Sequence, residues 1–399
     1  MGTAAGTRTW YRWVVLAVGT LAQAATAAVL LGLPSVTPAL REFFGLDLVG
    51  VGTMLSVVVA GTAITLLPWG SAADRFGERG VMTIGLASGT IVLGLVAFID
   101  QPVPAGVLLA LAGAAGGSVN AASGRAVMTW FAAHERGLAM AVRQTAIPLG
   151  AAVAAGVLPH VASASGVPAV FGVLAVGCGV AAAAVAAGIR EPPDTPLAPG
   201  GIARATAVLR DPRLLRISLA GMLLIVPQFL GSAFLVEVLV TSHGIAMTTA
   251  GVLLALSQVL AVLGRLGCGL WSDRTGSRLR PLRTVAVMVA VGFAAVAVAA
   301  TTGSASLLAA VLIPTTALAT SWNNLVFTAA GELAPPGRAA TAMAMSNTAN
   351  HISAAVTPAV GGALAQQAGW PVVFTLGILT ALAGLAALHR VGETSPGTC

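Results

Sequence analysis

Lysine is absent from this sequence of 399 residues, and cysteine and charged side chains are scarce. Without lysine, the chain can form neither a Walker A phosphate-binding loop nor a Schiff base with a carbonyl substrate. The motifs His-Glu-x-x-His and Gly-x-Ser-x-Gly are also missing, and Cys178, Cys268 and Cys399 have no metal-binding spacing. We therefore expect no enzyme, no metal site and no cofactor.

Charged residues make up 8% of the sequence, against roughly 25% in ordinary soluble domains. Hydrophobic residues make up 57%, and the mean hydropathy is +0.93. A soluble fold of this size could not cover its surface with so few polar groups. The composition therefore indicates an integral membrane protein.

Twelve apolar stretches are long enough to cross a bilayer as a helix, which needs about 20 residues. They are 13–38, 48–70, 80–99, 105–130, 137–160, 168–189, 214–240, 246–271, 283–302, 305–330, 339–364 and 370–390. A polar segment rich in proline and glycine, 191–212, separates the sixth stretch from the seventh. We predict an all-α protein with twelve transmembrane helices in two six-helix bundles, 1–190 and 213–391, with a cytoplasmic linker between them and a cytoplasmic tail, 392–399.

The 20 basic residues, all arginine, concentrate on one side of this topology. With a cytoplasmic N-terminus, sixteen arginines lie at the cytoplasmic side, Arg41 alone lies outside, and three lie within spans. Both termini are then cytoplasmic, and the pI of about 11.1 reflects topology rather than nucleic-acid binding. We expect a monomeric multi-pass protein of a bacterial cytoplasmic membrane, with lipid and a small molecule as its partners.

A ten-residue pattern, G-x-x-x-D-R-x-G-x-R, occurs in two loops 199 residues apart. The first copy has Gly70, Asp74, Arg75, Gly77 and Arg79, and the second has Gly269, Asp273, Arg274, Gly276 and Arg278. A weaker echo relates residues 139–146 to 342–349 at an offset of 203. Two halves in the same orientation imply a parallel repeat about an axis along the membrane normal.

On these motifs the whole chain resembles the major facilitator superfamily of secondary transporters. The segment 136–150 is also similar, more loosely, to the branch with cyanate- and nitrate-type permeases. The resemblance implies alternating access by rocking of two halves. It also implies a gating latch, in which Asp74 would bind the start of the eleventh span and Asp273 the start of the fifth. The alternative is a plain solvated turn with cytoplasmic arginines.

Three arginines lie within predicted spans, where ionisable side chains usually face a cavity or a partner. Arg125 and Arg143 fall at matching depth, roughly 10 Å inside the cytoplasmic boundary. Because no acid lies deep in the first half, these two cations favour an anionic group on the substrate. Snorkelling, or a structural pair of Arg125 with Asp74, is the alternative, and we expect a structural role for Arg265.

Neutral polar residues gather near the middle of particular spans. They are Gln23, Asn120 and Gln144 in the first half, and Gln228, Gln258, Trp322, Asn323, Asn324, Asn347, Asn350 and His351 in the second. Spans 3, 6, 9 and 12, the outer supporting helices of the family, carry almost nothing comparable. We therefore take this set, with Arg125 and Arg143, as substrate-binding candidates, although each could instead make a structural hydrogen bond between helices.

The sequence thus predicts a transporter of a small anion, in which His351 or Glu237 could couple transport to protons. Anion exchange and facilitated diffusion are alternatives. Drug or metabolite efflux is the rival, but the family's Gly-Pro motif in span 5 is incomplete, with Ala151 at the proline position and Pro148 three residues earlier. A receptor of the same fold is disfavoured, because the predicted tail is short.

Overall fold

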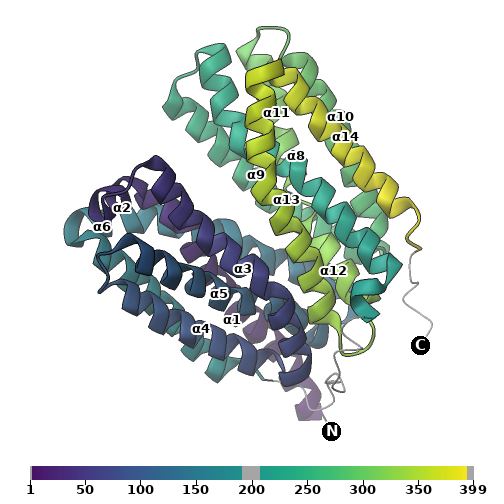
Figure 1. The fold of residues 1–399 in the computed structure, drawn as a ribbon. Coiled ribbons are helices and arrows are strands. Elements are labelled where there is room, and N and C mark those ends of the chain that lie inside the picture. Colours follow the sequence, from purple (N-terminus) through teal and green to yellow (C-terminus); the bar gives the residue numbers. More distant parts are fainter. Residues whose placement is uncertain (1, 191–206, 393–399) are drawn as a thin grey trace. The chain divides into compact units, whose positions relative to one another are not determined.

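The computed structural model describes residues 2–190 and 207–392, and all regular structure in these residues is helical (Figure 1). The all-α architecture expected from the sequence is confirmed. Within the predicted linker and tail, residues 191–206 and 393–399, including Cys399, lie outside the described residues.

The chain divides into two compact units that do not coincide with its two halves. Unit 1 comprises Met1–Ala132, Val142–Val208 and Ala334–Thr348, and unit 2 comprises Ala133–Ala141, Leu209–Leu333 and Ala349–Cys399. Each unit therefore includes a short segment from the other half of the chain. Both segments contain the start of a long helix.

Unit 1 is built from helices of the N-terminal half. They are α1 (Gly2–Gly32), the 3-10 helix η1 (Leu33–Val36), α2 (Thr37–Phe44), α3 (Leu48–Phe76), α4 (Glu78–Val96), α5 (Pro102–Trp130) and most of α6 (Arg136–Gly188). The first residues of α13 (Ala339–Ala368) also belong to it. Small residues let α3 and α5 pack closely, since a Cβ at Gly113 would lie 2.0 Å from the Val58 carbonyl oxygen.

Unit 2 is built from helices of the C-terminal half. They are α8 (Pro212–His243), α9 (Met247–Thr275), α10 (Leu279–Ala299), α11 (Ala305–Ala319), α12 (Asn323–Leu333), the rest of α13 and α14 (Trp370–His389). The 3-10 helix η2 (Ala133–Glu135) and the start of α6 also belong to unit 2. Here α14 packs against α8 and α10.

The helices depart from the predicted stretches at the first, 13–38, which covers the end of α1, all of η1 and the start of α2, and at the tenth. The fifth and sixth stretches form two helical segments of α6, separated at Gly166, where φ is 79° and ψ is 174° and the backbone is not helical. The tenth stretch, 305–330, lies within one candidate span, Ala305–Leu333, but its helix is interrupted, because α11 ends at Ala319 and α12 begins at Asn323.

Ten helical segments of the described chain are long and apolar enough to cross a membrane. One of them, Ala133–Gly188, covers two predicted stretches, and α13 is not among them. Large apolar side chains such as Phe98 and Ile64 lie on the surface, as a lipid-facing exterior requires. The count of twelve and the orientation of the termini stay predictions.

Candidate functional site

The first loop motif holds its aspartate against the start of α13, within unit 1. The Asp74 carboxylate accepts hydrogen bonds from the backbone N–H groups of Ala340, at 3.0 Å, and Thr341, at 2.8 Å. The Thr341 hydroxyl donates a third bond, at 2.6 Å. Gly70 permits this approach, since a Cβ there would lie 2.9 Å from the Ala340 carbonyl oxygen. A buried carboxylate at a helix N-terminus satisfies N–H groups that have no partner within the helix.

Arg125 lies in a buried charge cluster beside this contact. Its Nε lies 3.7 Å from Asp74 Oδ1, and its Nη1 donates a hydrogen bond to Glu78 Oε2. All three side chains are buried, and the Thr129 hydroxyl donates to Glu78 Oε1 at 3.3 Å. Two acids do lie beside Arg125 at the loop motif, because Asp74 and Glu78 are both fully buried there. The structure thus pairs Arg125 with Asp74, which is the alternative to substrate contact stated in the sequence analysis.

The second loop motif repeats the contact in unit 2, with the start of α6. Asp273 accepts hydrogen bonds from the backbone N–H groups of Gly137, at 2.9 Å, and Leu138, at 2.8 Å. Glycine at both contact points allows the backbones to meet, since a Cβ at Gly269 would lie 2.6 Å from the Gly137 carbonyl oxygen. Both copies therefore hold the same type of contact between a carboxylate and a helix N-terminus.

Arg278 supplies the cation of the second copy. Its Nη1 donates to Asp273 Oδ1 at 2.7 Å, and its Nη2 lies 3.1 Å from Glu332 Oε1. Arg136 lies 3.7 Å from the same Glu332 oxygen. Burial lowers the pKa of Arg278, but the hydrogen bonds and charges of Glu332 and Asp273 raise it by more, so that it lies above the ordinary arginine value. Arg278 therefore stays charged at any physiological pH.

The other arginines of the two motifs lie at the surface. Arg79 donates to the Ala186 carbonyl oxygen at 2.6 Å and is exposed. Arg75 is exposed and stacks over the Phe76 ring, with its guanidinium carbon 5.0 Å from the ring centroid. Arg274 is exposed as well.

A cavity of about 320 Å³ adjoins the second motif and is lined by residues that include His134, Ser277, Arg278 and Glu332.

A polar cluster around Arg143 lies in the interior of unit 1 and joins α1, α5 and α6. Arg143 is buried, and its Nε donates to Ser123 Oγ at 2.8 Å. Its Nη1 donates to Gln144 Oε1 at 3.0 Å, and its Nη2 donates to the Asn120 carbonyl oxygen at 2.9 Å and to Gln23 Oε1 at 3.2 Å. Gln23 also donates from Nε2 to Asn120 Oδ1 at 2.8 Å. The structure therefore brings together Arg143 and all three neutral candidates of the first half.

A second polar cluster lies in unit 2, where the tenth stretch is broken. Asn323 donates from Nδ2 to Gln228 Oε1 at 2.9 Å, which joins α12 to α8. Arg265 is buried, and its Nε donates to the Thr320 carbonyl oxygen at 2.9 Å. Asn324 donates from Nδ2 to the Arg265 carbonyl oxygen at 3.4 Å. Through these two hydrogen bonds Arg265 contacts the segment in which the helix is interrupted between α11 and α12.

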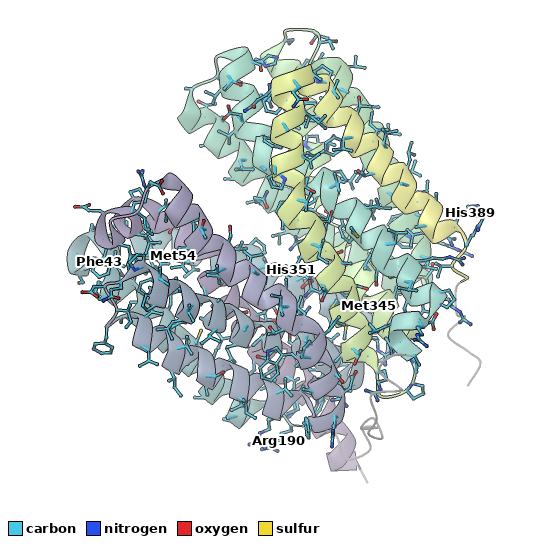
Figure 2. All side chains as sticks on the ribbon, in the orientation of Figure 1. Phe43, Met54, Arg190, Met345, His351 and His389 are labelled. Atoms are coloured by element: carbon cyan, nitrogen blue, oxygen red, sulfur yellow. The ribbon has the colours of Figure 1, made fainter. Side chains whose placement is uncertain are left out.

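The remaining candidates are spread over unit 2 and the start of α13. Trp322 and Asn350 are buried near the break, and Gln258 is half-buried on α9. Asn347 and His351 are half-buried on α13, where Figure 2 labels His351. Glu237 is exposed on α8. No contact among the described residues ties Glu237 or Gln258 to either polar cluster.

Glu78, Ser123 and Glu332 are among the residues in these contacts that were not singled out from the sequence. Glu78 occupies an unspecified position of the first loop motif, and its counterpart in the second copy is Ser277. The presence of an acid at this position in only one copy was the signal that could have identified Glu78. Ser123 follows Asn120 at helical spacing, which places both on one face of a helix. No sequence pattern marked Glu332, because it lies after the tenth predicted stretch and outside both loop motifs.

Comparison with known proteins places these features in a family. A model of the Major Facilitator Superfamily matches residues 15–358. An uncharacterized MFS-type transporter of Mycobacterium tuberculosis is 34% identical over 366 residues, which is 92% of this chain and 82% of that protein. An uncharacterized transporter of Bacillus subtilis is 30% identical over 102 residues, 26% of this chain and 23% of that one.

Solved structures share the fold at low sequence identity. The E. coli fucose:proton symporter superposes with a TM-score of 0.75 at 15% identity, covering 96% of this chain and 98% of that one. A bacterial homologue of the iron transporter ferroportin, in an outward-facing state, gives a TM-score of 0.80 at 14% identity, covering 96% and 99%. A human organic anion transporter gives 0.76 at 17% identity, covering 94% and 99%. At these identities the likeness shows the fold alone.

Proposed function

The chain belongs to the Major Facilitator Superfamily of membrane transporters, and from that premise we propose that it moves a small organic or inorganic anion by alternating access. It would do so as a monomer and without catalysis. The coupling candidates from the sequence, His351 and Glu237, stay within the proposal.

The observation that carries the anionic substrate is the position and setting of Arg143. Its guanidinium is buried within the polar cluster of unit 1, and four oxygen atoms from Ser123, Gln144, Gln23 and Asn120 hold its orientation. Arginine keeps its charge even when buried, and an anion that displaced some of these oxygens would meet a planar set of N–H donors that matches carboxylate or phosphate. A cation held in place in advance costs little ordering free energy when an anion binds.

The gating part of the proposal rests on the two aspartates of the loop motifs. Rocking of residues 1–190 against residues 213–391 would break the hydrogen bonds from Ala340 and Thr341 to Asp74, and those from Gly137 and Leu138 to Asp273. Breaking and remaking charged hydrogen bonds at a helix N-terminus would give each end state a defined stability.

A thermal-shift screen of the purified full-length protein tests the substrate class. The ligands are small carboxylates, inorganic anions and lipophilic cations. We expect an anion to raise the unfolding temperature of the wild-type protein, and Arg143→Ala to weaken its affinity tenfold to a hundredfold, because a charged hydrogen bond contributes about 1.5–3 kcal/mol.

Arg265→Ala serves as the matched control, because Arg265 is also a buried arginine whose guanidinium binds a backbone carbonyl oxygen. It should lower stability without changing the affinity for the anion. Unchanged affinity in Arg143→Ala would contradict the role of Arg143. Stabilisation by lipophilic cations alone would favour the rival, drug efflux.

A further inference from the structure

One end of unit 1 carries aromatic and arginine side chains that join the start of α1 to the ends of α5 and α6. The Tyr11 hydroxyl donates a hydrogen bond to the Gly188 carbonyl oxygen at 3.0 Å, and Trp130 Nε1 donates to the Arg190 carbonyl oxygen at 3.1 Å. The rings of Tyr11 and Trp130 lie 5.6 Å apart. Figure 2 labels Arg190. We call the following residues the aromatic–arginine patch: Trp10, Tyr11, Arg12, Trp13, Trp130 and Arg190.

The patch lies where three candidate membrane-spanning segments begin or end. One begins at Trp10, another ends at Trp130, and a third ends at Gly188. The side chains of Trp10 and Trp13 are 58% and 46% exposed. Tryptophan is enriched at the boundary between lipid and water, because its ring is apolar and its N–H group is polar. The ends of the three segments therefore place the patch at the level of the lipid headgroups.

Two guanidinium groups of the patch lie over aromatic rings. The guanidinium carbon of Arg190 lies 5.1 Å from the centre of the Tyr11 ring, and that of Arg12 lies 5.6 Å from the ring centre of Trp13 and 5.5 Å from that of Phe131. Attraction to ring electrons orients a guanidinium without a hydrogen bond to a protein oxygen. Among the residues that the structure describes, the exposed Arg190 guanidinium makes no hydrogen bond and no ion pair, so its N–H donors can bind a ligand.

Charge is separated between the two ends of unit 1. At the end with the patch, α4 begins with the exposed Arg79, which donates to the Ala186 carbonyl oxygen near the end of α6. The acids at this end, Asp74 and Glu78, are fully buried beside a cation. The exposed acids of the described part of unit 1 lie at the opposite helix ends, after α1, before α3 and after α4: Glu42, Asp47 and Asp100. An anionic ligand at the patch therefore meets no exposed carboxylate of the described part of unit 1.

We propose that the aromatic–arginine patch binds the phosphate of an anionic phospholipid headgroup. Arg190 donates paired N–H bonds to the phosphate oxygens, and Arg12 adds a second positive charge. Trp10 and Trp13 pack against the glycerol and the upper acyl chains. A headgroup with net negative charge, such as that of phosphatidylglycerol, suits the two arginines, whereas the quaternary ammonium of phosphatidylcholine is repelled by them. This lipid partner is independent of the substrate that the protein transports.

The first experiment measures lipid binding to the purified full-length protein by native mass spectrometry. The probes are phosphatidylglycerol and phosphatidylcholine with the same acyl chains. We expect the wild-type protein to bind phosphatidylglycerol about fivefold or more tightly than phosphatidylcholine. Arg190→Gln should weaken phosphatidylglycerol binding about fivefold, because one basic residue at a membrane surface contributes about that factor. Its affinity for phosphatidylcholine should stay nearly unchanged.

Arg75→Gln is the matched control, because it removes an exposed arginine from the same end of unit 1 but outside the patch. Arg75 lies over the ring of Phe76 at 5.0 Å, so each of the two variants loses one charge and one contact with a ring. The affinity of Arg75→Gln for phosphatidylglycerol should stay close to that of the wild type. Equal losses in the two variants would show a general attraction between basic residues and acidic lipid, and would overturn the patch as a site.

A second pair of variants tests whether the Tyr11 ring positions Arg190. Tyr11→Leu removes the ring, whereas Tyr11→Phe keeps it and removes only the hydrogen bond to Gly188. We expect Tyr11→Leu to weaken phosphatidylglycerol binding about two- to fivefold, because an exposed contact between a cation and a ring contributes about that factor. Tyr11→Phe should bind like the wild type. Equal losses in both variants would contradict the role of the ring.

The last experiment distinguishes a lipid from a soluble phosphate. Inorganic phosphate and glycerol 3-phosphate are added in excess to the complex with phosphatidylglycerol. We expect neither to displace the lipid, because neither has acyl chains that pack against Trp10 and Trp13. Displacement by either would overturn the lipid as the ligand. Equal binding of phosphatidylglycerol and phosphatidylcholine to the wild-type protein would overturn the preference for an anionic headgroup.

Discussion

The two copies of the loop motif hold their aspartates alike but balance the charge from different places. Asp74 and Asp273 each accept two backbone N–H groups at the start of a helix. In unit 1 the cation comes from outside the motif, from Arg125 of α5. In unit 2 the last arginine of the motif itself, Arg278, binds the aspartate.

The turn at the second glycine of each motif explains the difference. Gly77 has φ 82° and ψ 162°, whereas Gly276 has φ 61° and ψ 16°, the left-handed helical conformation. The chain therefore leaves the two turns in different directions. Arg79 ends at the surface on the Ala186 carbonyl oxygen, and Arg278 turns inward to Asp273. The motif thus specifies the contact between the aspartate and a helix N-terminus, but not the source of the balancing cation.

The largest expected effect comes from removing the external cation of unit 1. Arg125→Leu leaves the buried Asp74 and Glu78 carboxylates without the guanidinium that both now contact. Loss of one partner from a buried ion pair costs about 3–5 kcal/mol, so we expect a large fall in unfolding temperature or a loss of folded protein. Thermal unfolding of the purified variant gives the answer. A variant as stable as the wild type would show that unit 1 does not depend on this cation.

The sharpest test compares one motif position in the two copies. Arg278→Leu removes a buried cation bound to Asp273 and Glu332, and we expect a loss of about 2–3 kcal/mol. Arg79→Leu changes an exposed residue and should leave the unfolding temperature nearly unchanged. Chemical unfolding of both variants tests the difference. Equal losses would mean that the two copies use this position in the same way.

The smallest of these effects is local and concerns the aspartates. In Asp74→Asn, an NH₂ group replaces one carboxylate oxygen, and it cannot accept the hydrogen bonds from Thr341. We therefore expect hydrogen exchange of the backbone N–H groups of Ala340 and Thr341 to accelerate about tenfold. Global stability should fall less than in Arg125→Leu. Hydrogen exchange measured by mass spectrometry reports both.

Asp273→Asn provides the paired measurement, at Gly137 and Leu138. We expect a smaller acceleration there, because Asp74 has a third donor, the Thr341 hydroxyl, and Asp273 has none from the helix start that it holds. Identical acceleration at both sites would remove this distinction between the copies. Unchanged exchange in both variants would contradict the role of the aspartates as latches.

Much of the architecture followed from the sequence. Apolar stretches predicted a helical membrane protein, and the two loop motifs predicted a repeat. The family resemblance that these motifs carry implied the contacts with the starts of the fifth and eleventh spans. The grouping of Gln23, Asn120 and Gln144 with Arg143 could not be derived, because spacing along one helix says nothing about which face meets another helix. The break at 320–322 was missed, because Thr320, Ser321 and Trp322 include neither the glycine nor the proline that marks a helix end in a sequence.

The sequence by itself therefore determined what must be buried in lipid and where the chain must turn, because hydropathy and glycine act locally. Only the tertiary structure decided which charges meet. Arg125 joins Asp74 and Glu78 through packing between α3, α4 and α5, while Arg278 reaches Asp273 through the conformation of a single glycine. Charge pairing in a buried environment depends on distances of a few ångströms between separate helices, and a local sequence pattern does not determine such distances.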